Sequence, residues 1–240
     1  MKRTRNGPRK LAALRSCLVL LLLIYPVFGD EQKASREEGQ FDIYVAGKRI
    51  GGEKFLIQNS SDSVSSSSTV NFRDPANSSQ NIKMETELKM NGQLVPQAYL
   101  LRTEVNGRRG LLKGTFAAGQ ASFEYLAGGS PSKRGLLVGD RFVVLDTNVF
   151  YHFVFIARLF DFESKEKTQS MEVVIPQELD NGVLKVSEMG VETTSVRGKK
   201  RELHHLKADS GTVKIDLWID DQRILYKIAL PLKGIEVIRE

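Results

Sequence analysis

The feature that most constrains the fold is a strict alternation of apolar and charged side chains in the middle of the chain. Between residues 82 and 90, apolar residues and Thr86 occupy every second position, with lysine or glutamate between them. Successive side chains of a β-strand point to opposite faces, so this pattern predicts a strand with one buried face and one solvated face. Asn91-Gly92 follows directly and favours a two-residue type I′ turn, because both central positions of that turn need positive φ.

Turn signals of the same kind recur along the chain. Outside residues 140–181, glycine, asparagine and aspartate signals between Gly92 and Asp221 lie about 8 to 15 residues apart. Short strands at this spacing are typical of an antiparallel meander. Neither an internal repeat nor a linker is visible, so residues 41–240 are expected to form a single β-rich domain.

The stretch of residues 59–70 is rich in serine. We expect an exposed strand or a long loop whose hydroxyls face water. A glycosylated or phosphorylated switch is the alternative, and nothing nearby in the sequence supports it.

One segment departs from the alternation. Residues 148–162 hold five of the twelve phenylalanines of the chain. Helical spacing sorts their apolar side chains into two stripes: Val149, Phe153, Ile156 and Phe160 on one, and Phe155, Leu159 and Phe162 on the other. Two stripes predict a helix near residues 148–161 that is buried on more than one side, with Asp146, Thr147 or Asn148 as its N-cap. A doubly buried strand is the alternative, because aromatic residues also suit strands.

The predicted fold class is therefore mainly β: a curved antiparallel sheet, or half-open β-barrel, with one apolar helix near residues 148–161.

Residues 1–29 have the pattern of a secretory signal peptide. They carry six basic residues and no acid, and the apolar run from Cys17 to Phe28 has 12 residues. A membrane-spanning helix needs about 20 apolar residues, so cleavage after Gly29 is expected, with an uncleaved anchor as the alternative. Residues 30–40 are polar and predict a short flexible leader before the domain. Location in a periplasm or outside the cell follows from these features.

Charge and cysteine content narrow the function further. The formal net charge is +6, but removing the six basic residues of the signal segment leaves 29 basic against 29 acidic side chains. A mature chain without net positive charge lacks the excess of basic side chains that binds a phosphate backbone, so no nucleic-acid partner is expected. Cys17 is the only cysteine, so the mature chain has no disulfide, no thiol nucleophile and no thiolate metal site.

No known catalytic or metal-binding pattern appears. His204 and His205 are neighbours on a predicted strand and point to opposite faces, and His152 has no second histidine four residues away. Neither a G-x-S-x-G elbow nor a phosphate-binding glycine loop occurs, and the two S-x-x-K matches lack the elements that accompany such a site. We therefore predict no catalytic residue, no metal, no cofactor and no enzymatic activity.

Three strings in the second half of the chain carry a family resemblance: LDTNVFYHFVFIARLFDF, MEVVIPQE and LWIDDQRILYKIALPLKGIEVIRE. They resemble the uncharacterised exported bacterial proteins of a domain of unknown function, over roughly residues 41–240. The resemblance rests on positions that maintain the fold, namely Trp218, Asp220, Arg223, Leu225 and Pro231. Such proteins are similar in outline to the lipoprotein localisation factors, whose half-open barrels hold acyl chains, and this analogy implies an apolar ligand.

The leading functional hypothesis is an exported, non-catalytic envelope protein that binds a lipid, an acyl chain or a partner segment. Its concave face is expected to bind through Phe150, Phe153, Phe155 and Trp218. A packed core made of the same residues is the competing interpretation. An envelope hydrolase with an unrecognised site and a structural domain that acts through a sheet edge are the other two alternatives.

Overall fold

The computed structural model describes residues 35–240 except 76, 78 and 128. The predicted signal peptide of residues 1–29 lies outside this range. Fifteen strands of the described part form one sheet, in which every neighbouring pair is antiparallel except β9 and β10. Within the same residues, no helix has the length and apolar character needed to span a bilayer.

The first half of the chain is a continuous meander. Its strands are β1 (Ser35–Val45), β2 (Lys48–Asn59), β3 (Ser63–Arg73), β4 (Asn81–Asn91), β5 (Pro96–Val105), β6 (Arg108–Ala117), β7 (Gln120–Ala127) and β8 (Ser130–Leu137). The second half begins at the other end of the sheet and returns to its middle. Its strands are β9 (Phe142–Val144), β10 (Thr168–Ile175), β11 (Asp180–Val196), β12 (Lys199–Asp209), β13 (Lys214–Ile219), β14 (Leu225–Leu230) and β15 (Ile235–Arg239).

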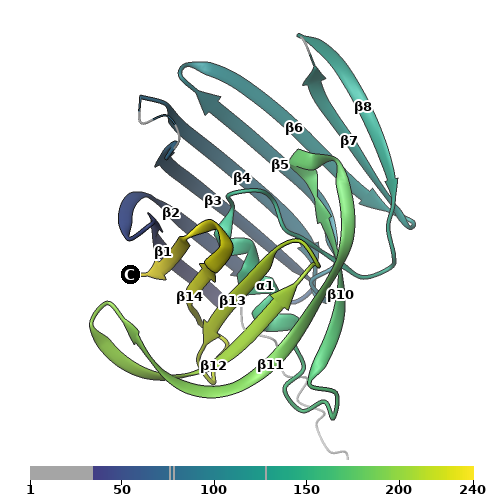
Figure 1. Cartoon of the computed structure of the whole chain (residues 1–240). Helices are drawn as coiled ribbons and strands as arrows, with labels where there is room; N and C mark the ends of the chain where they lie inside the picture. The colour runs from purple at the N-terminus through teal and green to yellow at the C-terminus, as the bar shows by residue number, and fades with distance from the viewer. Residues whose placement is uncertain (1–34, 76, 78, 128) are drawn as a thin grey trace, which may run out of the picture. The chain divides into compact units, whose positions relative to one another are not determined.

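The last strand joins the two halves, because β15 pairs with β1. The edges of the sheet are therefore β8 and β9, which are consecutive in the chain but not hydrogen-bonded to each other. The predicted curved, unclosed sheet is confirmed (Figure 1).

The edge at β9 lies against the inner face of β5 and β6. The rings of Phe116 and Phe142 meet edge to face at 5.2 Å, and the Tyr99 hydroxyl donates to Asp146 Oδ2 at 2.6 Å. The edge strand β9 thus lies inside the curve of the first half of the sheet. Side-chain contacts, rather than backbone hydrogen bonds, join β9 to β5 and β6. We call the line of contact between β9 and β5–β6 the seam.

The predicted helix is confirmed and fills the interior of the sheet. A 3-10 turn, η1 (Phe150–His152), continues into α1 (Phe153–Leu159), and every side chain from 150 to 157 is buried. Figure 1 shows α1 between the strands of the first half and the yellow-green strands of the second half. Two further 3-10 turns, η2 (Pro176–Glu178) and η3 (Pro231–Lys233), follow β10 and β14.

Side chains from distant parts of the sheet hold both ends of this helix, one from β2 and one from the β13–β14 turn. Glu53 Oε2 on β2 accepts the backbone N–H groups of Phe150 and Tyr151, each at 2.9 Å. At the other end, Arg223 Nη1 donates to the carbonyl oxygens of Arg158 and Phe160 at 2.7 and 2.8 Å. The prediction that Asp146, Thr147 or Asn148 caps the helix is therefore wrong. The helix begins inside the sheet, where a strand residue is better placed to accept its first N–H groups than the preceding loop is.

The predicted two-residue turn at Asn91-Gly92 is also wrong, since four residues, 92–95, connect β4 to β5. Asn91 Oδ1 accepts the N–H groups of Gln93 and Val95, both at 3.0 Å, while the Gly92 N–H donates to the Asp62 carbonyl. Leu94 adopts the left-handed conformation in this turn, with φ of 61°. The Gly92 N–H is thus bonded to the neighbouring β2–β3 turn. The Asn91 side chain closes a four-residue β4–β5 turn, which the sequence pattern did not predict.

The first strand starts earlier than its apolar pattern indicated. β1 begins at Ser35, so residues 35–40 are strand rather than part of a flexible leader. Two features replace apolar alternation here. Gly39 leaves room for the ring of Phe55, and the half-buried Glu37 forms ion pairs with Arg158 and Arg239. Polar residues can therefore extend a strand when their partners lie on the helix and the neighbouring strand.

We predict that replacing the buried Phe155 with alanine will destabilise the protein by about 3–5 kcal/mol, because it leaves a cavity under the helix. Leu137→Ala is the control, since this side chain is 84% exposed and its loss should change the free energy of unfolding by less than about 0.5 kcal/mol. Urea denaturation of the two variants measures both values. Equal effects would contradict the placement of Phe155 in the core.

Candidate functional site

The three phenylalanines predicted to bind a ligand are part of the core. The exposed fractions of Phe150, Phe153 and Phe155 are 6%, 8% and 1%. The Phe155 ring packs edge to face against Tyr151, and Arg158 lies over its other side. Side chains therefore fill the concave face at this point.

Trp218, the fourth predicted binding residue, lies on the opposite face of the sheet. Its neighbours in β13, Leu217 and Ile219, are fully buried in the core, and alternation turns the indole the other way. There it stacks on His205 at 4.9 Å between ring centroids and donates its N–H to Glu192. The four predicted residues thus do not form one surface.

A buried polar cluster beneath the helix was missing from the sequence-based expectations. We define this interior cluster as Glu53, Ser66, Ser68, Thr86, Tyr99, Asp146, Tyr151 and His152, all of them buried.

The serines of the cluster correct the expectation for residues 59–70. Most of this segment is the strand β3, and its alternate residues Ser66 and Ser68 face the interior. Ser66 Oγ lies 3.2 Å from the Tyr151 hydroxyl, and Ser68 Oγ lies 3.0 Å from Thr86 Oγ1. Serine composition suggested contact with water, but buried hydroxyls are satisfied equally well by one another.

The two ionisable groups at the centre of the cluster are held near their neutral forms. Burial raises the pKa of Glu53 from 4.5 to about 8, against smaller opposing effects of its hydrogen bonds to Ser68 and to the helix N–H groups. Burial lowers the pKa of His152 from 6.5 to about 3. The neutral His152 ring accepts the Asp146 N–H at Nδ1, which places its proton on Nε2. Nε2 and Glu53 Oε1 are buried and have no hydrogen-bond partner among the residues that the structure describes.

The remaining histidines, His204 and His205, have different side-chain partners, as expected for neighbours on a strand that point to opposite faces. His204 contacts Phe162 and Asp221, whereas His205 contacts Trp218 and Asp216. In the part of the chain that the structure describes, no three His, Cys, Asp or Glu side chains gather as a metal ion requires.

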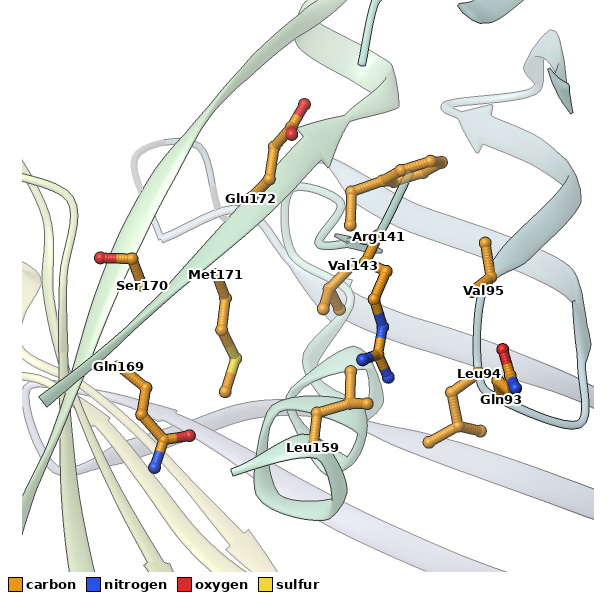
Figure 2. A pocket seen from close by; sticks show the side chains of 11 residues that line it. Gln93, Leu94, Val95, Arg141, Val143, Leu159, Gln169, Ser170, Met171 and Glu172 are labelled. Carbon is orange, nitrogen blue, oxygen red and sulfur yellow. The ribbon is translucent and has the colours of Figure 1, made fainter. Parts of the chain in front are cut away.

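The cavity best placed to receive a ligand lies at the seam. It lies where the β4–β5 turn faces β9, the end of α1 and β10, and its volume is about 230 Å³. We call it the seam pocket; it is lined by Gln93, Leu94, Val95, Arg141, Phe142, Val143, Leu159, Gln169, Ser170, Met171 and Glu172. Figure 2 shows the Met171 side chain on one side, Leu94 and Val95 on the other, and Leu159 between them. Its walls thus come from segments far apart in the sequence.

Four of the apolar side chains that line the seam pocket are only half buried. Leu94, Val95, Leu159 and Met171 all have intermediate exposure, although three of them pack against the core. Leu94 also keeps the strained left-handed backbone of the turn. Apolar surface that converges on a cavity without filling it is characteristic of small-molecule sites.

Other hollows are larger but differ in their charges. One of about 410 Å³ over β4–β7 is lined by Lys83, Glu85, Arg102 and Arg109, among others. Its charges are already paired, as in the 2.6 Å contact of Lys83 with Glu85 and the 2.7 Å contact of Arg102 with Glu87.

Fold and cavity together define a β-barrel-like domain with an open seam. Among solved structures, the chain is similar to the crystal structure of a β-barrel-like protein of the domain of unknown function DUF1849 from Brucella abortus, with a TM-score of 0.57 and 10% sequence identity. The similarity covers 86% of this chain and 94% of that chain. No protein-family model and no curated protein matches the sequence. At this identity the likeness concerns the fold alone, while export and the outline similarity to localisation factors stay predictions.

The interior cluster predicts an unusual pH dependence of stability. Between pH 4.5 and 8, folded Glu53 keeps a proton that the unfolded chain loses, so stability falls as pH rises. Between pH 3 and 6.5, unfolded His152 binds a proton that the folded chain excludes, so stability rises with pH. The two effects oppose each other from pH 4.5 to 6.5, where we expect the largest free energy of unfolding.

Glu53→Gln should remove much of the decline above pH 6.5. The amide still offers an oxygen to the helix N–H groups but does not titrate, so about 1.5 kcal/mol of the loss between pH 6.5 and 8 should disappear. Burial also raises the pKa of Asp146, so its titration contributes a pH dependence of the same sign that the variant keeps. Urea denaturation at pH 5, 6.5 and 8 measures this, with the exposed Glu163→Gln as control. A variant that declines as steeply as the wild type would refute the role of Glu53.

Proposed function

We propose that this chain is an exported, non-catalytic protein that binds the apolar chain of a lipid in the seam pocket. The observation that carries the proposal is the cavity of about 230 Å³ with half-buried apolar walls next to the end of the helix. The site differs from the one expected from the sequence, because Phe150, Phe153 and Phe155 are occupied in packing the core.

The size of the cavity suits part of an acyl chain. At about 30 Å³ for a group of the size of a water molecule, 230 Å³ holds roughly eight methylene groups. Each buried methylene contributes about 0.8 kcal/mol of transfer free energy, so such a segment contributes about 6 kcal/mol toward the cost of association. A longer chain would extend through the open mouth of the pocket.

Export is supported by the sequence of the first 29 residues. A lipid-binding role fits an envelope compartment, where acyl chains must be shielded from water when they leave a membrane.

A hydrolase is the less favoured alternative. The acids, hydroxyls and histidine of the interior cluster could perform acid–base chemistry, but Glu53 and His152 in that cluster are 0% exposed. A catalytic group must come within hydrogen-bond reach of its substrate, and these are sealed beneath the helix.

A structural role through strand addition is also less favoured. The edge strand β8 carries Pro131, Lys133 and Arg134, residue types that discourage pairing with another strand. The opposite edge, β9, has only three residues, all of them buried. Neither edge offers a long, open ladder to a partner.

Filling the seam pocket should abolish binding. We predict that Met171→Trp will reduce the affinity for decanol at least about tenfold, because the indole occupies the space that the chain needs. Leu126→Trp, at an exposed position of β7, is the matched control. Titration calorimetry gives both affinities, and circular dichroism shows whether each variant is folded. Undiminished binding to folded Met171→Trp would place the ligand elsewhere.

Protein purified from its own host should carry a ligand and a processed N-terminus. We expect native mass spectrometry to show a mature chain that begins at Asp30, together with a second species heavier by the mass of a lipid. Solvent extraction followed by mass spectrometry identifies that lipid. A chain that retains residues 1–29 would contradict the cleavage, and protein that never carries a lipid would contradict the binding role.

A further inference from the structure

One charged side chain of the seam pocket has no partner. Arg141 directly precedes β9, and none of the ion pairs or side-chain hydrogen bonds among the described residues involves its guanidinium. Figure 2 shows this group extending into the cavity toward Leu159, rather than away from it. An arginine is always charged near neutral pH, so the pocket holds a fixed positive charge beside apolar walls.

Two of the other polar side chains around the pocket, Glu172 and Gln169, are already engaged. Glu172 accepts the Gly139 N–H through both carboxylate oxygens, at 2.9 and 3.0 Å. The Gln169 side chain is bonded twice to the backbone of Asp161. Figure 2 also shows Glu172 at the opposite end of the cavity from the Arg141 guanidinium. The negative charge is therefore directed toward the chain's own backbone, and the positive charge toward the space for a ligand.

We propose that the seam pocket selects an amphiphile with an anionic head, either a carboxylate or a phosphate, which pairs with Arg141 while its aliphatic chain lies against Leu159, Met171 and Leu94. This inference rests on the proposed function and adds the chemical class of the ligand. A planar guanidinium can donate two parallel hydrogen bonds to either head group. Burying the adjoining apolar surface also removes water from that contact, which strengthens it.

The test compares four probes with the full mature chain at pH 7: decanoate, decyl phosphate, decanol and acetate. Titration calorimetry should show that decanoate or decyl phosphate binds more tightly than decanol, and that acetate, which lacks the chain, does not bind. The ratio of the two anionic probes identifies the preferred head group. Tight binding of acetate alone would overturn the proposal, because it would indicate a site for small anions.

Variants of Arg141 separate the head group from the chain. Arg141→Gln should weaken decanoate binding about tenfold and leave decanol binding unchanged, because only the charged contact is lost. Arg141→Lys should recover part of the affinity, since it restores the charge without the planar fork. Arg108→Gln is the matched control: it removes the same charge from an exposed position outside the pocket.

The possible failures are distinguishable. If Arg141→Gln binds decanoate as the wild type does while Met171→Trp does not, the anionic preference is wrong and the lipid-binding role stands. If wild-type protein binds neither decanoate nor decanol, the proposed function fails and this inference fails with it.

Discussion

The rest of the structure depends on how the sheet accommodates a helix that starts and ends in its interior. The first N–H groups and last carbonyl groups of a helix have no partners within it, and leaving them unpaired in a core costs several kcal/mol. Glu53 on β2 satisfies the first pair and Arg223 in the β13–β14 turn the last, so the two contacts come from opposite halves of the sheet. The interior cluster follows from this arrangement. A carboxyl group placed beneath the helix requires hydroxyls and aromatic residues around it, and the cluster supplies them from β3, β4 and β5.

The same helix also determines where the seam pocket lies. Its side chains fill the concave face near residues 150–157, and the pocket lies beyond its C-terminal end. There Leu159 meets the β4–β5 turn and β10 across the seam. The pocket is thus a product of two facts at once: the helix is short, and the two edges of the sheet pass each other without pairing.

Much of the fold could be predicted from local patterns. The alternation around Thr86 indicated a strand, and the density of phenylalanine indicated a buried helix, because both signals are short-range consequences of side-chain periodicity. The site could not be predicted in the same way. Glu53 lies 97 residues before Phe150 in the chain, so nothing in its neighbourhood marks it as a helix cap. Alternation did place Trp218 opposite Leu217, but it cannot say which face of a sheet is concave. Arg141 and Met171 become neighbours only through the parallel pairing of β9 with β10.

The open seam has a mechanical consequence. A closed barrel has a circumference fixed by its backbone ladder, whereas this sheet has one adjustable dimension, the gap between β9 and the inner face of β5 and β6. Widening that gap disturbs contacts such as those of Phe142 with Phe116 and of Asp146 with Tyr99, but breaks no pair in the strand ladder. The continuous sheet from β8 round to β9 therefore does not depend on the width of that gap.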